Sequence, residues 1–174
     1  MNEREEQSPK EETWEKARQE VETDADGAGR GIDDGIKEAV VAMRVNGFET
    51  EQSCEGGEHD KHGQPYPWIR FGTPEPGGWE DNDELKSEWK RANDEQRTRL
   101  AALLEEFSAG RETPEDVRLV FEDHGIYGVF EIHSQGGEAM KTLAPEAQQQ
   151  KRELYRQEMD DFTAFLKSRF FLKE

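Results

Sequence analysis

The densest group of reactive side chains lies at residues 50–63, in the run Thr-Glu-Gln-Ser-Cys-Glu-Gly-Gly-Glu-His-Asp-Lys-His-Gly. It contains the single cysteine of the chain, Cys54, followed by His59 and His62. Two glycines separate the cysteine from the histidines, and glycine allows positive φ angles and the close approach of a ligand. We therefore predict the functional site in this loop. The alternative is a flexible polar connection with a partly buried cysteine.

The loop also contains candidate metal ligands. Cys54, His59 and His62 offer sulfur and nitrogen atoms of the kind that bind zinc, and His133 or His124 would complete a tetrahedral set. Structural zinc sites usually pair their ligands two to four residues apart on both sides, and here only the two histidines of the loop follow that spacing. Zinc at Cys54, His59, His62 and His133 is thus one interpretation, and the sequence indicates no other cofactor.

A cysteine nucleophile is a further interpretation of the same loop. Catalysis by Cys54 requires a lowered thiol pKa and a nearby base, for which the histidines are candidates. The neighbouring carboxylates of Glu51, Glu55 and Glu58 oppose thiolate formation. The chain contains no Ser/His/Asp arrangement, phosphate-binding glycine loop or dinucleotide fingerprint. The sequence leaves open whether the protein is an enzyme.

The segment after the loop combines aromatic rings with a guanidinium group. Residues 66–71 read Tyr-Pro-Trp-Ile-Arg-Phe, and alternate side chains of a strand there would line a pocket beneath the loop. Such a pocket suits a planar or anionic ligand. Alternatively, Trp68 is a core residue and Arg70 pairs with a surplus carboxylate. The sequence thus predicts a domain that binds a small molecule or a peptide of unknown identity at the loop 54–62 and the strand after it. The predicted ligand-binding residues are Thr50, Ser53, Cys54, Glu55, His59, Trp68 and Arg70.

These motifs resemble an uncharacterised family of small bacterial and phage proteins. In that family a helix ending in Asn-Gly precedes Thr-x-x-Ser-Cys-Glu-Gly-His, and Pro-Trp-Ile/Val follows. This chain inserts two residues, Gly57 and Glu58, before its histidine. The family implies no function. The matching residues are Gly47, Phe48, Thr50, Ser53, Cys54, Glu55, Gly56, His59, Pro67, Trp68 and Ile69.

A more distant resemblance is to the wybutosine-synthesis tRNA methyltransferase-like family. That family also places a Ser-Cys-x-Gly run after a helix and at a strand end, and the matching residues here are 53–56. The family's basic residue after the glycine is absent, so we assign no methyl-donor binding residues. The charge of the chain also argues against a tRNA substrate.

The charge balance limits the classes of partner. The 174 residues include 41 acidic and 23 basic side chains, which give a formal net charge of −18. Such a surface repels phosphate backbones and excludes non-specific nucleic-acid binding. Its simplest explanation is solubility or adaptation to a salty cytoplasm. A second function class follows from it, a non-enzymatic acidic protein that binds a basic protein partner in phage–host conflict or regulation.

The sequence predicts a cytoplasmic protein. One cysteine cannot form an intramolecular disulfide, and residues 1–7 lack the apolar run of a signal peptide. No segment approaches the roughly 18 consecutive apolar residues of a membrane-spanning helix. We therefore expect no membrane partner, and the oligomeric state is undetermined.

The order of elements predicts an α+β fold. Helical spacing of apolar residues is found at 32–43, 82–109 and 154–170, and strand patterns are found at 48–52, 66–71, 117–122 and 126–133. This order favours an antiparallel sheet of about four strands covered by three main helices. Both Trp89 and Phe162 are expected in the core.

The first thirty residues differ from the rest in composition. Residues 1–30 are rich in charge, with Trp14 and Val21 as their large apolar side chains after the first methionine. We interpret them as a disordered or loosely docked acidic tail and linker, with a helix at 11–22 that turns Trp14, Ala17 and Val21 to one side. Residues 31–174 are predicted to form a single domain.

Overall fold

The computed structural model of the protein describes residues 8–26, 29–57 and 63–172. These residues form a four-stranded antiparallel sheet with strand order β1-β2-β4-β3. The predicted α+β fold is confirmed. The strands are β1 (Thr50–Cys54), β2 (Trp68–Phe71), β3 (Leu119–His124) and β4 (Val129–Ser134), and the helices are α1 (Pro9–Thr23), α2 (Lys37–Val45), α3 (Asp83–Ser108), α4 (Gly137–Met140) and α5 (Pro145–Leu172), with 3-10 turns at Asp34–Ile36 (η1) and Trp79–Asp81 (η2).

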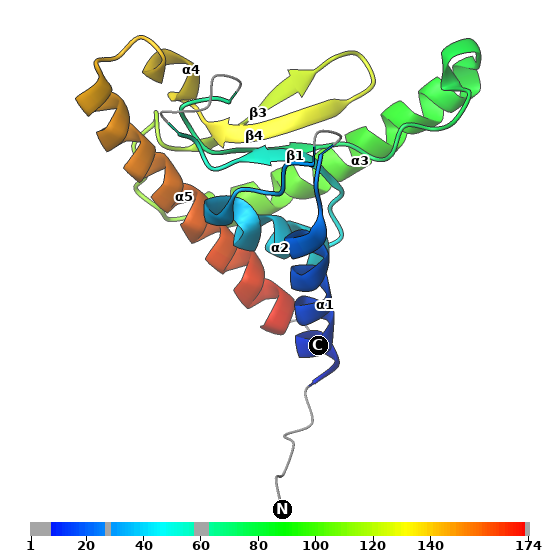
Figure 1. The fold of residues 1–174 in the computed structure, drawn as a ribbon, viewed down its shortest axis with the longest axis horizontal. Coiled ribbons are helices and arrows are strands. Elements are labelled where there is room, and N and C mark those ends of the chain that lie inside the picture. The colour runs from blue at the N-terminus through cyan, green and yellow to red at the C-terminus, as the bar shows by residue number, and fades with distance from the viewer. Residues whose placement is uncertain (1–7, 27–28, 58–62, 173–174) are drawn as a thin grey trace, which may run out of the picture.

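Alternation along the strands gives the sheet two different faces. The inner face carries Ile69 and Phe71 of β2 opposite Ile132 and Phe130 of β4, all fully buried. Helices α2, α3 and α5 lie on this side of the sheet (Figure 1), and their apolar residues belong to the same core. The outer face is polar and includes Arg70. The main core therefore lies entirely on one side of the sheet.

Helix α1 packs against this core. Ser8 caps it, because the Ser8 Oγ accepts from the Glu11 backbone N–H and the Glu11 carboxylate accepts from the Ser8 N–H. Trp14, Ala17 and Val21 are buried as the helical spacing predicts. The boundary at residue 31 remains a prediction, and residues 1–7 lie outside the described part.

The buried side of α3 differs from the predicted stripe. Leu100 and Phe107 are buried as expected, whereas Trp89 is half-buried outside the main core. Trp89 instead stacks on Tyr127 with ring centroids 5.1 Å apart and donates to the Thr73 carbonyl at 3.0 Å. Two polar residues, Asn93 and Gln96, are buried in its place.

The hydrogen bonds of the Asn93 side chain explain why a polar residue is buried on α3. Its side-chain oxygen accepts from the Thr73 N–H at 2.8 Å, and its amide nitrogen donates to the Tyr127 carbonyl at 2.9 Å. It therefore joins the segment after β2 to the β3–β4 turn. None of the helices in the described ranges combines the length and apolar character needed to span a membrane.

Candidate functional site

The outer face of the sheet brings together three of the predicted site residues. In the strand register Cys54 pairs with Trp68, and Trp68 pairs with His133 on its other side. Arg70 lies two residues after Trp68 and therefore shares its face, as does its partner Gln52. The Cys54 and Arg70 side chains thus extend from the same side of the sheet, as a single site requires.

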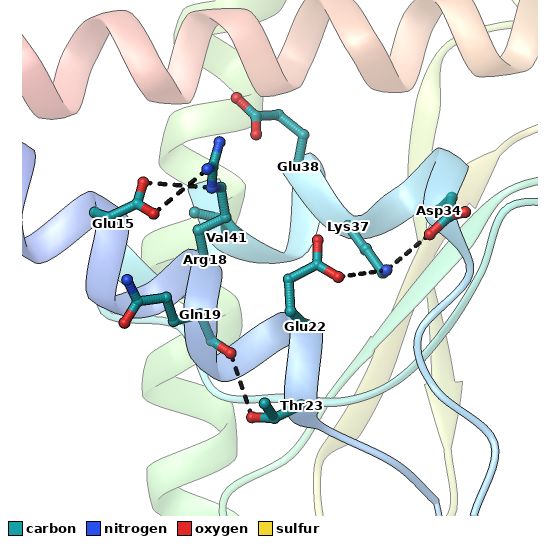
Figure 2. A pocket seen from close by; sticks show the side chains of 9 residues that line it. All are labelled: Glu15, Arg18, Gln19, Glu22, Thr23, Asp34, Lys37, Glu38 and Val41. Carbon is teal, nitrogen blue, oxygen red and sulfur yellow. Dashed lines mark hydrogen bonds and ion pairs between the residues drawn. The ribbon is translucent and has the colours of Figure 1, made fainter.

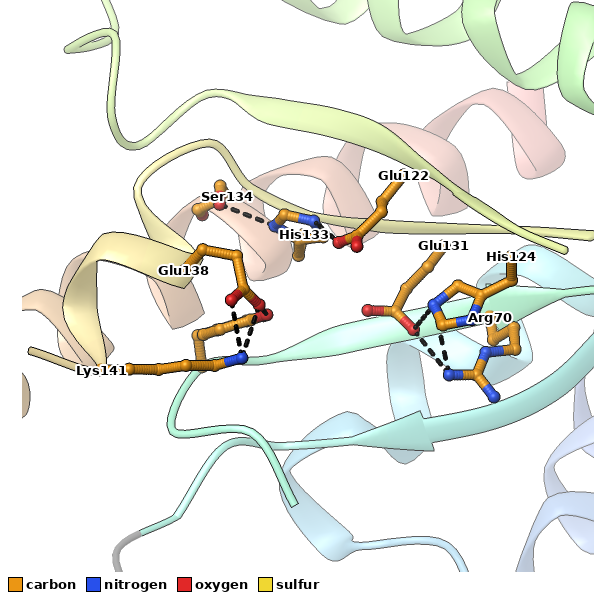
Figure 3. A network of polar contacts seen from close by, with 9 residues as sticks. Arg70, Glu122, His124, Glu131, His133, Ser134, Glu138 and Lys141 are labelled. Carbon is orange, nitrogen blue, oxygen red and sulfur yellow. Dashed lines mark hydrogen bonds and ion pairs between the residues drawn. The ribbon is translucent and has the colours of Figure 1, made fainter. Parts of the chain in front are cut away.

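Arg70 is occupied by a buried carboxylate on the neighbouring strand. Its Nη2 donates to the Glu131 Oε2 at 3.1 Å, and the His124 Nε2 lies 3.1 Å from the same oxygen (Figure 3). The Arg70 Nη1 donates to the Gln52 Oε1 at 2.8 Å. Glu131 is only 3% exposed. Because its carboxylate already neutralises the guanidinium, Arg70 favours an anionic ligand less than the sequence suggested.

His133 lies two residues after Glu131 on the same face of β4, and its side chain is about as buried as that of Glu131. It is 5% exposed, and the Tyr66 ring covers it with centroids 5.2 Å apart. The His133 Nδ1 lies 2.8 Å from the Ser134 carbonyl oxygen, and its Nε2 lies 2.9 Å from the Glu122 Oε2 (Figure 3). A carbonyl oxygen can only accept, so the Nδ1 carries a proton. The Nε2 is consequently the ring nitrogen directed at Glu122.

Tyr66 closes this end of the outer face. Its hydroxyl donates to Glu138 of α4, and Lys141 donates to both oxygens of the same carboxylate at 2.6 and 2.8 Å. Burial, followed by the hydrogen bond to Glu138, raises the pKa of Tyr66 well above its usual value. The hydrogen bond from Lys141 lowers the pKa of Glu138. Tyr66 therefore stays a neutral donor over the physiological pH range.

The start of the β1–β2 loop is a packed turn. The Glu55 carboxylate accepts from the Gly35 N–H at 2.6 Å, and Arg156 donates to the carbonyl oxygens of Glu55 at 3.0 Å and Gly56 at 2.5 Å. Gly56 has a φ of 75°, and a Cβ there would lie 2.6 Å from the Tyr66 carbonyl carbon. Glu55 and Gly56 thus hold the turn in place.

Cys54 is buried beside this turn, and its sulfur accepts from the Gly56 N–H at 3.3 Å. Strand β1 includes Ser53 and Cys54, which the sequence placed in the loop. The predicted site residues His59 and His62 lie outside the described residues.

Of the predicted zinc set, the described residues include only Cys54 and His133, so the set stays a prediction. Cys54 and His133 belong to β1 and β4, with β2 between them, so their backbones are separated by roughly 10 Å. Within the described ranges, the residues that place metal-binding atoms within 4.8 Å of one another are Glu122, Glu131 and His133. Sequence reasoning included His133 but missed both glutamates. Their signal was the alternation of acidic residues and histidine along the outer side of the hairpin.

A groove of about 490 Å³ follows the free edge of the sheet. All five residues of β1 line it, together with Trp68 and with residues 24–26 and 30–33, which precede α2. It therefore contains the predicted residues Thr50, Ser53, Cys54 and Trp68. Its charged lining residues are Asp24, Asp26, Asp33, Glu51, Arg30 and Arg44. Arg44 pairs with Asp24 at 2.6 Å and Arg30 with Asp26 at 2.8 Å, so both guanidinium groups of the wall already have a carboxylate partner and the wall retains an excess of negative charge.

A second groove of about 720 Å³ lies between α1 and α2 (Figure 2). Its charged side chains are paired, and Glu38 pairs with Lys167 of α5 outside the groove. Lys37 donates to Glu22 at 2.8 Å and contacts Asp34 at 2.7 Å, while Arg18 lies 3.3 Å from Glu15. This mutual pairing is typical of a solvated surface between packed helices.

Comparison with known proteins adds no functional assignment. No family model matches the chain, and neither a curated protein nor a solved structure shows significant similarity to it. The resemblances of residues 47–69 to the two families therefore remain predictions. The candidate site depends on the geometry of the outer face and of the β1 groove.

Proposed function

We propose that the protein binds an extended peptide segment with basic side chains along the free edge of β1. The observation that carries the proposal is that the whole of β1 lines a groove that residues 24–26 and 30–33 also line, with three aspartates and one arginine among them. β1 is an edge strand, so one row of its backbone groups faces away from β2. Among the described residues, no backbone hydrogen bond joins β1 to residues 24–33.

An added strand is a common mode of peptide recognition. Main-chain hydrogen bonds to the edge supply affinity, and alternate side chains supply specificity. The carboxylates of Asp33 and Glu51 in the groove wall favour lysine or arginine in such a peptide. The overall charge of −18 would also speed the encounter with a basic partner. This mode unites the peptide-binding and acidic-interaction functions that the sequence suggested.

Trp68 supports a ligand in this groove. The ring lines the groove, and its indole Nε1 is buried without a hydrogen-bond partner among the described residues. A buried donor that lacks an acceptor destabilises a protein by about 1–3 kcal/mol. The nitrogen is covered in this structure, so a peptide carbonyl group would supply that acceptor after a rotation of the ring. The guanidinium of Arg70 lies 5.2 Å from the ring centroid of Trp68 and holds the ring in place.

The test is a titration of isotope-labelled protein with two short peptides of alternating valine and charged residues, one with lysine and one with glutamate. We expect the lysine peptide to shift the amide resonances of β1 and the indole resonance of Trp68, with an affinity that falls as salt rises. The glutamate peptide should not bind. Binding of small molecules to the groove without any peptide binding would contradict the proposed ligand.

A matched pair of charge reversals locates the interaction. Glu51 and Glu146 are both exposed, and Glu51 lines the groove whereas Glu146 lies in the first turn of α5. Glu51→Lys should weaken the lysine peptide about tenfold, equivalent to about 1.4 kcal/mol. Glu146→Lys changes the net charge equally and should leave the affinity within about twofold. Equal losses in both variants would show non-specific attraction and contradict the proposal.

A further inference from the structure

The ring of His133 directs its Nε2 at the carboxylate of Glu122. Because its Nδ1 proton is directed at the Ser134 carbonyl, a neutral imidazole presents the lone pair of Nε2 to Glu122, 2.9 Å away. Two acceptors at that distance repel each other. Either a second proton or a metal ion must lie between them. The same arrangement, a histidine that donates its other nitrogen to a backbone carbonyl, is typical of metal-binding histidines.

The cross-strand neighbours strengthen this requirement. Glu122 and Glu131 are direct partners in the β3–β4 register, and like charges in such positions destabilise a hairpin. Glu131 is also buried, which increases the unfavourable effect of a second carboxylate beside it. The Arg70 guanidinium neutralises one of the two carboxylates. The position between Glu122, Glu131 and His133 therefore attracts a further positive charge.

We propose that Glu122, Glu131 and His133 bind one divalent transition ion of the zinc class. Imidazole nitrogen and carboxylate oxygen are both usual ligands of zinc. Their ligand atoms lie within 4.8 Å of one another, whereas bonds of about 2.0–2.2 Å in a tetrahedral site require separations of roughly 3.3–3.6 Å. The His133 Nε2 and the Glu122 Oε2 are 2.9 Å apart, so these two atoms must separate slightly while the more distant ligand atoms approach, and the Glu122 side chain, 47% exposed, has room to move.

Neighbouring groups hold the two buried ligands from behind. Arg70 and His124 both contact the Glu131 Oε2 at 3.1 Å, which leaves the other carboxylate oxygen for the ion. The Ser134 carbonyl fixes the ring orientation of His133. Three protein ligands leave a coordination position for water or for a ligand atom, as in sites that polarise a bound group.

Equilibrium dialysis and native mass spectrometry of the chelator-treated full chain test this site with Zn²⁺ alone. We expect one ion per chain, and Co²⁺ in its place should give the visible absorption bands of a low-coordinate complex with oxygen and nitrogen ligands. Glu122→Gln preserves shape on an exposed side chain and should weaken Zn²⁺ binding at least about tenfold. No bound ion in the wild-type protein would overturn the proposal.

Two control variants distinguish this site from others. Glu146→Gln removes an exposed carboxylate from α5 and should leave Zn²⁺ binding unchanged. Cys54→Ser should also retain the ion, because Cys54 lies two strands from His133. Loss of binding in Cys54→Ser together with full binding in Glu122→Gln would place the metal at the β1–β2 loop and overturn the proposal. The peptide titration does not involve Glu122, so the two proposals fail independently.

Discussion

Two adjacent residues of β4 are buried on opposite faces of the sheet and illustrate two kinds of burial. Phe130 is fully buried on the inner face, stacked on Phe71 with centroids 5.0 Å apart. Glu131, the next residue, is 3% exposed on the outer face and contacts Arg70 and His124. Nearly equal burial thus serves an apolar core on one side and a charged network on the other.

The difference between apolar burial on the inner face and charged burial on the outer face indicates which face mainly stabilises the fold and which face binds a ligand. Burial of apolar surface stabilises the fold by roughly 25 cal/mol per Å², whereas a buried charge must first recover its lost hydration. The outer face also holds Trp68 and Arg70, each with a buried nitrogen that has no partner among the described residues. We therefore expect substitutions on the inner face to affect stability and those on the outer face to affect binding.

The largest expected effect is that of Phe130→Ala. Removal of a fully buried ring that contacts both Phe71 and Phe121 should lower the free energy of unfolding by about 3–5 kcal/mol. Urea denaturation followed by circular dichroism measures the change. A loss below about 1 kcal/mol would mean that the inner face is not the main source of stability.

Helix α1 adds to the helical layer on the inner side of the sheet, and Val21→Ala tests how much its packing contributes to the free energy of unfolding. Val21 is 1% exposed in the main core, so removing two methyl groups should lower the free energy of unfolding by about 2 kcal/mol. The exposed Glu12→Ala on the same helix should change it by less than about 0.5 kcal/mol. Hydrogen exchange of α1 amides should match that of α2. Rapid exchange throughout α1 would instead support the predicted boundary at residue 31.

The outer face should respond less to Glu131→Gln. The change keeps the shape but removes the charge that Arg70 and His124 contact, and we expect a loss of about 1–2 kcal/mol. The loss is limited because Arg70 keeps its hydrogen bond to Gln52. The same urea experiment compares this variant with Phe130→Ala. If Glu131→Gln destabilised the protein more, the charged network would be a structural element and the contrast between the faces would fail.

Much of the fold could be predicted because its signals are local. The apolar spacing of α5 predicts that Phe162 is buried, and the alternation of Leu119 and Phe121 predicts the inner side of β3. Trp89 and Asn93 show where the local signal ends. A tryptophan at helical spacing predicts a core residue. The segment after β2 and the β3–β4 turn, however, present backbone groups to this part of α3, and the Asn93 side chain forms hydrogen bonds with them.

The candidate site depends on register, which the sequence does not specify. The strand patterns at 117–122 and 126–133 imply a turn at 123–125, whereas the structure extends β3 to His124 and turns at residues 125–128, with positive φ at Gly125 and Gly128. That register pairs Glu122 with Glu131 and adds His124 to the outer face. A shift of one residue would move every side chain to the other face. Trp68 and Arg70 could be predicted together because they share one strand.

Glu158 of α5 is a second buried carboxylate, and it lies on the helical side of the molecule. Its effect on stability can be compared with that of Glu131 on the outer face, and we expect it to be the smallest of these effects. Burial raises its pKa, and the Arg111 guanidinium, which donates to it at 2.5 Å, opposes the rise. Because the pKa of Glu158 is raised, the folded state binds more protons than the unfolded state. The stabilisation that this protonated carboxyl provides is complete when the pH is below its ordinary pKa of about 4.5, and it is lost as the pH rises through the pKa of the folded state. Glu158→Gln removes that loss, and its stability relative to wild type should therefore improve between pH 4 and pH 7. Urea titrations at several pH values measure the trend, with the exposed Glu146→Gln as control for the removal of one carboxylate.

A relative stability that falls with rising pH would show that the ion pair with Arg111 outweighs burial. The buried carboxylate on the helical side would then be stabilised by its guanidinium partner, as Glu131 is on the outer face.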